Sequence, residues 1–263
     1  MKKKHISIIV LLFTFAHLNA KAFFINDTLK INAKNVNPNV LIEGSHRYLV
    51  YFKKGKDAPR IMPAFWTRTI KKVDFKKQKA IQIEQLWEQN DTIIHKTTSI
   101  SDAKTMQWLY HKSWWQKKGE SVYNYKAKTA SINDFQLNDK DTVKNRSRSW
   151  LAFKNSWDEY ALNWHLDLEI FPILPYKKGV TFEIPFYDPG FSPPKNVYYT
   201  VMGSKKLKGY NNKEIDCWLL EHNTKGNKEL FWISKKTKEV LKLEQEISEG
   251  KFYRYKVKLA FSN

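Results

Sequence analysis

The chain has 263 residues, one cysteine, and 46 Lys and Arg residues against 26 Asp and Glu residues, a formal charge of +20. Its composition is 42% hydrophobic and 15% aromatic, which supplies a core and excludes general disorder. The nine Gly and nine Pro exclude a collagen-like chain, and the single cysteine excludes an intrachain disulfide framework or an all-cysteine metal site.

The first 22 residues contain the three parts of a secretory signal peptide. A positive start at Lys2 to Lys4 precedes a mostly apolar run from Ile6 to Ala16, and Ala20-Lys21-Ala22 follows as a small-x-small cleavage pattern. The apolar run is too short to cross the ~30 Å hydrocarbon core of a bilayer. We therefore expect cleavage after Ala22, and a single β-rich domain over residues 23–263, soluble in the periplasm of a Gram-negative bacterium and without a transmembrane span.

The basic charge of an exported protein points to anionic components of the envelope as partners, and not to nucleic acid. Lipid headgroups, lipopolysaccharide and acidic glycans all have the required negative charge. Basic residues are also common on solvated faces without any partner, and the sequence leaves that alternative open.

Most of the remaining chain alternates apolar and polar residues with a period of two, which is typical of strands with one buried face. Asn90-Asp91 and Gly119 are expected turns between such segments. The predicted strands are 46–53, 80–88, 92–100, 106–114, 121–128, 180–186, 197–202, 216–222 and 230–234, followed by a C-terminal hairpin. This rhythm predicts a mainly β fold, a curved antiparallel sheet or open half barrel.

One amphipathic helix is predicted over 156–171, covering the sheet. Ser156 and Glu159 fit a capping box, an apolar stripe follows at helical spacing, and Pro172 ends it. The polar, charged stretch 132–149 is predicted to be a loop, either a lid or passive. A second irregular stretch is expected over 188–194.

The C-terminal hairpin allows a prediction of register, because residues opposed across a hairpin share a face. Placing Ile247 opposite Tyr253 and Leu243 opposite Val257 brings apolar residues together. It also places Glu244 opposite Lys256 and Glu246 opposite Arg254 on the wet face, where the charges attract. The implied loop, 249–251, has Gly250 at its centre.

No motif in the sequence supports a catalytic or metal site. His165, Asp167 and Glu169 form the densest polar group, but on a helix only His165 and Glu169 adjoin, so we interpret the group as helix surface. Cys217 lies among apolar neighbours and is interpreted as a small buried hydrophobe. No catalytic residue, metal ligand or cofactor is therefore predicted.

The ten tryptophans are the more unusual feature of the composition. They either fill a broad core or line a concave face that binds an acyl chain or a sugar. The candidate lining residues are Trp108, Tyr110, Trp114, Trp218, Trp232, Tyr253 and Tyr255.

Three Asp-Thr-aliphatic triplets resemble the O-glycosylation sequence used on exported proteins of the Bacteroidetes. They make Thr28, Thr92 and Thr142 candidate modification sites, with chance occurrence as the alternative.

The C-terminal half, roughly 155–261, resembles a bacterial exported domain family of unknown function related to the LolA/LolB-like lipoprotein carriers. The residues that carry the resemblance are "PILPYKKGVTFEIPFYD", "IDCWLLEH", "LFWISKKTKEVLKLEQEISEG" and "FYRYKVKLAF". The resemblance implies a curved, incompletely closed sheet with helix on its concave side, where the carriers hold lipid acyl chains.

Together these observations predict non-enzymatic binding of a lipid, a lipoprotein acyl chain or another amphiphilic envelope molecule. A carbohydrate-binding or scaffolding module is one alternative. An enzyme acting on envelope polymers is another, and a cleft that joins two or more of His95, His111, His165 and His222 with carboxylates would favour it.

Overall fold

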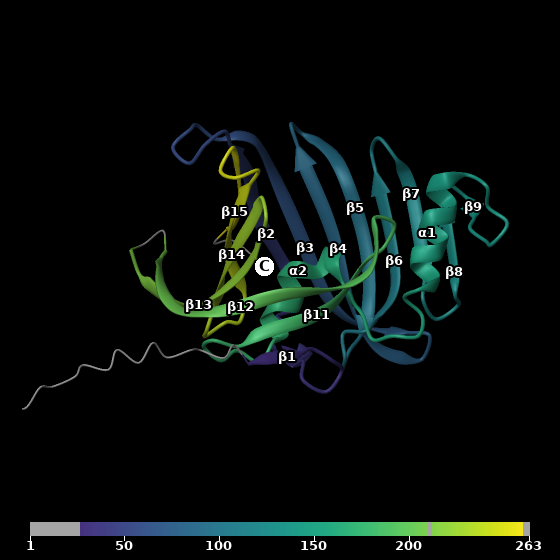
Figure 1. Cartoon of the computed structure of the whole chain (residues 1–263), viewed down its shortest axis with the longest axis horizontal. Helices are drawn as coiled ribbons and strands as arrows, with labels where there is room; N and C mark the ends of the chain where they lie inside the picture. Colours follow the sequence, from purple (N-terminus) through teal and green to yellow (C-terminus); the bar gives the residue numbers. More distant parts are fainter. Residues whose placement is uncertain (1–26, 210–211, 260–263) are drawn as a thin grey trace, which may run out of the picture.

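The structure is a computed structural model that describes residues 27–209 and 212–259, so the predicted signal peptide lies outside the described residues. The first half contains β1 (Thr28–Lys30), β2 (Gly44–Lys53), β3 (Ile61–Phe75), β4 (Gln78–Gln89), β5 (Thr92–Asp102), β6 (Trp108–Trp115), β7 (Gly119–Asn124), β8 (Thr129–Ile132) and β9 (Phe135–Gln136) (Figure 1). The second half contains β10 (Leu162–Asn163), β11 (Thr181–Asp188), β12 (Ser192–Lys208), β13 (Glu214–Thr224), β14 (Asn227–Ser234), β15 (Val240–Ile247) and β16 (Phe252–Lys258). The helical segments are η1 (Pro38–Val40), α1 (Lys144–Lys154), η2 (Trp164–Leu166), α2 (Asp167–Ile170) and η3 (Phe171–Ile173).

All the described strands belong to one sheet, which does not close on itself. Its order is β1-β11-β12-β13-β14-β15-β16-β2-β3-β4-β5-β6-β7-β8-β9, with β10 beside β11. The two halves of the chain join where β16 pairs antiparallel with β2. The predicted fold class, a mainly β chain with a curved open antiparallel sheet, is confirmed.

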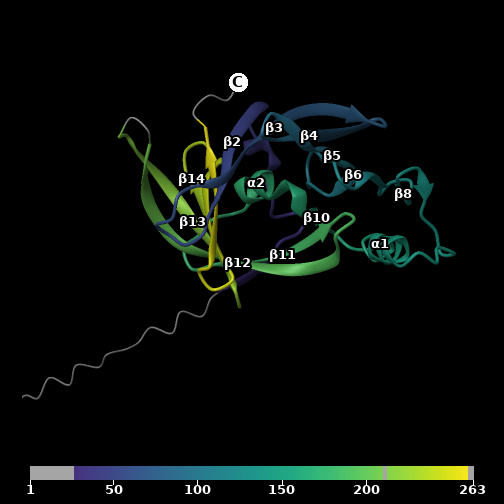
Figure 2. The same ribbon diagram turned by 90° about the horizontal axis from the view of Figure 1, so that it is seen from above.

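The sheet curls around the short helical segment η2-α2-η3. Figure 2 shows α2 inside the curve, with β13 and β14 on one side and β11 and β12 passing beneath it. The main hydrophobic core fills this space, where Leu166, Leu168 and Phe171 pack against inward residues of the strands. A second, smaller core beside α1 contains Trp108, Tyr123 and Phe153.

Each strand predicted from alternation overlaps an observed strand, although 106–107 and 125–128 lie outside the strands. The Asn90-Asp91 turn has both residues at positive φ between paired Gln89 and Thr92. The strand β3, one of the longest, is absent from the strands predicted from the sequence. Its inward face carries Trp66, Arg68 and Ile70, and a charged residue in the middle hides the apolar alternation.

The predicted helix over 156–171 is wrong. Only Asp167–Ile170 is α-helical, between two 3-10 turns, and Leu162–Asn163 pairs with β11 as a strand. The Ser156 hydroxyl donates to the Phe153 carbonyl at 2.7 Å and so belongs to the end of α1, not to the start of a new helix. The sheet encloses this segment, so apolar side chains are buried on several of its sides. Their spacing in the sequence resembles the apolar stripe of an amphipathic helix.

The loop predicted over 132–149 is also wrong in part, because α1 begins at Lys144 and β9 precedes it. Val143 at the helix start makes no side-chain capping hydrogen bond, so the sequence lacks an N-terminal helix signal there. The helix is held instead by Phe153, which is fully buried in the second core.

The predicted register of the C-terminal hairpin is wrong by one residue. Ile247 pairs with Phe252, Glu246 with Tyr253 and Lys242 with Val257, so the loop is 248–251. The slip reverses the faces of β16: Lys256 is 3% exposed and lies inside the curve, whereas Tyr255 stacks on Tyr51. Inside the curve Lys256 is paired with Asp167, so the buried face of β16 carries this cation in place of Tyr255.

Candidate functional site

An open cleft of about 440 Å³ lies where the β11–β12 hairpin approaches the inner face of β3, β4 and β16. Its lining combines aromatic, cationic and acidic side chains from strands far apart in the sequence. The lining residues are Trp66, Arg68, Trp87, Trp164, His165, Asp167, Asp188, Phe191, Ser192, Lys195, Arg254 and Lys256.

Aromatic rings form both sides of the cleft. Trp66 and Trp87 are cross-strand partners on β3 and β4, and their rings stack with centroids 3.8 Å apart and planes 5° apart. On the other side Trp164 stacks on Phe186 at 5.2 Å. Phe191, at the tip of the β11–β12 hairpin, is 49% exposed, so an apolar ring is available to a ligand.

A buried ion network forms the floor of the cleft. Asp167 accepts from Arg68 Nη2 at 2.9 Å and from Lys256 Nζ at 2.5 Å, and Glu169 accepts from Arg68 Nη1 at 2.5 Å. The Gln85 side chain donates to the His165 carbonyl at 2.7 Å and fixes the turn that precedes Asp167. A short helical segment is thereby tied to strands from both halves of the chain.

The pKa values of this network follow from burial and from neighbouring charges. Burial alone would raise the pKa of Asp167, but Lys256 and Arg68 outweigh it and hold that pKa below its ordinary value. Burial lowers the pKa of Lys256 to about 8, with Arg254 and Arg68 acting in the same direction and Asp167 opposing. Burial also raises the pKa of Glu169, against the charge of Arg68.

Three of the four histidines named in the sequence analysis lie together behind the cleft. The ring centroid of His165 lies 4.7 Å from that of His111 and 6.0 Å from that of His95, and His165 Nε2 lies 3.0 Å from Asp188 Oδ1. His222 lies elsewhere, against Tyr199.

Only His165 of this group reaches the cleft. His95 and His111 are fully buried, and burial lowers the pKa of His95 to about 3 and that of His111 well below its ordinary value. Ser99 contacts His111 Nδ1 at 2.9 Å, but its side chain is also buried, 1% exposed, away from any substrate. The group thus has a serine and a histidine base without access for a substrate.

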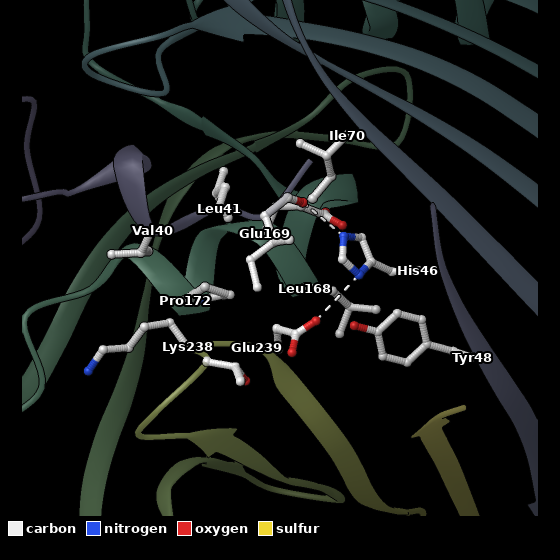
Figure 3. A pocket seen from close by; sticks show the side chains of 12 residues that line it. Val40, Leu41, His46, Tyr48, Ile70, Leu168, Glu169, Pro172, Lys238 and Glu239 are labelled. Atoms are coloured by element: carbon white, nitrogen blue, oxygen red, sulfur yellow. Dashed lines mark hydrogen bonds and ion pairs between the residues drawn. The ribbon is translucent and has the colours of Figure 1, made fainter. Parts of the chain in front are cut away.

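A small cavity beside η1 is a structural feature and not a ligand site. Figure 3 shows His46 turned toward Glu239, with their closest atoms 3.4 Å apart. The cavity holds about 20 Å³, which is room for one water molecule. Hydrogen bonds from His46 and Lys258 overcome the effect of burial and lower the pKa of Glu239 to about 2.

The structure does not bring the seven predicted lining residues together, and none of them lines the cleft. Trp108 is buried in the second core, and Trp218 borders a separate surface groove, where it stacks against Tyr176. The others are half-buried at scattered places on the sheet: Tyr110, Trp114, Trp232, Tyr253 and Tyr255. A role for any of them in binding stays a prediction.

The other singled-out residues are placed as follows. Thr28, Thr92 and Thr142 are all exposed, and their modification stays a prediction. Cys217 is buried, as expected.

Asp167 and Glu169 were interpreted as helix surface, which is wrong, because they face Arg68 inside the sheet. Within residues 27–209 and 212–259, no group of three or more His, Cys, Asp or Glu side chains could hold a metal ion.

Most of the residues that line the cleft were not predicted from the sequence. Trp66 and Arg68 belong to the missed strand, and Arg254 and Lys256 were assigned to the wet face of β16. One local signal could have indicated part of the cleft. Trp66, Arg68 and Ile70 are spaced two residues apart, so a strand here would place all three on one face and bring a cation among apolar side chains. Nothing local indicates that β12 approaches these strands.

A family model described as "Protein of unknown function (DUF3108)" matches residues 47–258. No curated protein matches the chain significantly. Among solved structures, a beta-barrel-like protein of domain of unknown function DUF1849 from Brucella abortus has a TM-score of 0.40 at 8% identity, covering 83% of this chain and 98% of its own. A DUF1329 family protein from Desulfovibrio piger has a TM-score of 0.32 at 11% identity, covering 84% and 86%. For the part of the chain that is described, no helix has the length and apolar character needed to cross a membrane.

Proposed function

Because the chain belongs to the DUF3108 family of proteins of unknown function, we propose a function from the cleft: non-enzymatic binding of an amphiphilic molecule of the bacterial envelope, with a lipid as the preferred class. Because the sequence predicts an export signal over residues 1–22, the proposal includes the periplasm as the compartment of this activity. One observation carries the proposal: aromatic walls and charged side chains, among them the cations Lys195 and Arg254, line the same open cleft.

The dimensions of the cleft suit part of an amphiphile. Ligand pockets commonly enclose about 300–1,000 Å³ and combine apolar walls with a few polar groups. Each 100 Å² of acyl chain buried against the rings would contribute roughly 2.5 kcal/mol before the costs of association. Phe191 is well placed to contribute, since its ring lies 5.6 Å from His165 at the edge of the cleft.

Native mass spectrometry of the protein recovered from periplasm without detergent tests this function directly. We expect a reproducible added mass that fragments as a lipid. A clean protein mass, together with no binding of added lysophospholipid, would contradict the proposal. Binding of glycans in place of lipid would favour the carbohydrate-binding alternative.

A substitution at Phe191 tests whether the cleft is the site. Phe191→Ala should weaken lysophospholipid binding about tenfold, because one apolar wall is lost, and should leave the fold intact because the ring is exposed. Phe135→Ala is the matched control, since Phe135 is 62% exposed on β9 and also has a cation over its ring. Tryptophan fluorescence titration measures both, and equal affinities in the two variants would place the site elsewhere.

A further inference from the structure

We propose that Arg254 and Lys195, on opposite walls of the cleft, bind the negatively charged phosphate group of the amphiphilic ligand. The inference rests on the proposed function. It specifies that the ligand carries a phosphate group and that this group lies between Arg254 and Lys195. It follows from the pairing of the charges in the cleft.

The carboxylates of the cleft are already engaged. Asp167 is bound by Arg68 and Lys256, and Asp188 lies 3.0 Å from His165. Glu169, behind the floor, is bound by Arg68. Arg68 and Lys256 therefore offset the charges of Asp167 and Glu169, and Asp188 adds one further carboxylate beside His165.

Arg254 and Lys195 are the other two cations of the cleft. In residues 27–209 and 212–259, no carboxylate lies within 4.0 Å of either charged group. The Nε atoms of Arg254 and of the 1% exposed Arg68 are buried without a hydrogen-bond partner among the described residues.

The two cations lie on different walls of the cleft. Arg254 is on β16, beside the floor formed by Lys256. Lys195 is on β12, and its ammonium lies 4.6 Å above the Trp164 ring centroid, an attractive contact between a cation and an aromatic face. A ligand that enters between the walls can therefore reach both.

Phosphate is the chemistry that this pair fits. A guanidinium presents paired N–H donors that match phosphate oxygens, and a lysine ammonium adds a point charge with rotatable donors. The Trp66, Trp164 and Phe191 rings line the same cleft as these two cations. The same rings are available to the acyl chain, so both ends of a lysophospholipid have partners.

The test compares the binding affinities of two amphiphiles with the same acyl chain, a lysophosphatidic acid and the uncharged monoacylglycerol. Both are measured by calorimetric titration of the protein recovered after export. We expect the phosphate amphiphile to bind at least tenfold more tightly. Arg254→Gln and Lys195→Gln should each reduce this preference about tenfold and leave monoacylglycerol binding unchanged, because each removes a charge-assisted contact. Arg254→Lys, which keeps the charge, should retain part of the preference.

Lys205→Gln and Arg60→Gln are controls, since both side chains are exposed outside the cleft, and neither should change the preference. Equal affinity for the two amphiphiles would overturn the inference while the proposed function stands. If the protein without substitutions binds neither amphiphile, the proposed function itself is overturned. Equally tight binding of glycerol 3-phosphate alone would overturn the assignment to a lipid and identify a free phosphate ester as the ligand.

Discussion

Asp167 balances the charge of the cleft floor, because two almost fully buried cations depend on it. Arg68 and Lys256 are 1% and 3% exposed, and both donate to its carboxylate. Arg68 has a second acceptor in Glu169, but Lys256 has no second carboxylate within 4.0 Å among the described residues. A buried charge without its partner is costly, so this single side chain matters more for stability than most surface ion pairs.

We expect Asp167→Asn to lower the free energy of unfolding by about 3–5 kcal/mol, the usual cost of breaking a buried ion pair from one side. Urea unfolding at neutral pH measures the change. Asp74→Asn is the control, because Asp74 pairs with Lys79 where the side chains are 65% and 81% exposed, and its loss should cost less than about 1 kcal/mol. Similar effects of the two substitutions would show that the Asp167 network is not stabilising.

Glu239 gives the protein a dependence of stability on acid. Its pKa falls from the ordinary 4.5 to about 2 in the folded chain, so the stability from its ionised form is complete above 4.5 and is lost as pH falls toward 2. His46 has the opposite sign: its hydrogen bond to Glu239 raises its pKa, so its contribution is present below 6.5 and is lost as pH rises through the folded value.

Glu239→Gln should therefore remove roughly 3 kcal/mol of stability at pH 6 and much less near pH 2, flattening the acid limb of the stability curve. Unfolding free energies measured between pH 2 and 6 test this expectation. Glu249→Gln, in the exposed hairpin turn, should leave the curve unchanged. A parallel downward shift of the Glu239→Gln curve at every pH would indicate a packing effect in place of the charge effect.

At the scale of elements, turns of the sheet could be predicted where they contain Gly, Asn or Asp, the residues that most readily adopt the positive φ angles of such turns. Gly119 marks the β6–β7 turn as expected, at φ +80°, and a Cβ there would lie 2.0 Å from Asn133 Oδ1. That oxygen accepts from the Glu120 N–H at 2.8 Å, which ties the turn to the chain after β8. The glycine is required both for its backbone angle and for this close approach.

Gly119→Ala should destabilise the protein by about 2–3 kcal/mol, from left-handed backbone strain plus displacement of Asn133. Gly226→Ala is matched to it, since Gly226 has φ +77° in the β13–β14 turn and no atom within 4 Å of its Cβ position. That variant should cost only about 1 kcal/mol. Thermal unfolding of both compares them, and equal costs would mean that the Asn133 contact contributes nothing.

Two of the wrong predictions, the helix over 156–171 and the register of β16, share one cause, which is tertiary burial. The apolar spacing over 156–171 imitates a helix because the segment passes through the centre of the curved sheet. The register of β16 was derived from apolar matching, but the inner face carries Lys256 opposite Leu243, where Asp167 supplies the countercharge. Local rules assign charges to the wet face and have no means of identifying such a partner 89 residues away.

At the scale of the whole molecule, the cleft depends on contacts that are distant in the chain. Pairing of β16 with β2 brings Arg254 and Lys256 beside Trp66, and the β11–β12 hairpin adds Lys195 and Phe191 from the other side. The helical segment inside the curve supplies Asp167 from between them, as Figure 2 shows for α2. A binding site of this kind has no linear motif, because each strand contributes only one or two side chains.

The sequence by itself determined the fold class, most strands and two turns, because alternation with a period of two and the backbone preferences of Gly, Asn and Asp act over a few residues. The tertiary structure alone decided the order of the strands, the inward face of β16 and the lining of the cleft. These depend on pairing between distant segments and on burial of an ion network, whose energies come from partners that neighbouring residues in the sequence do not specify.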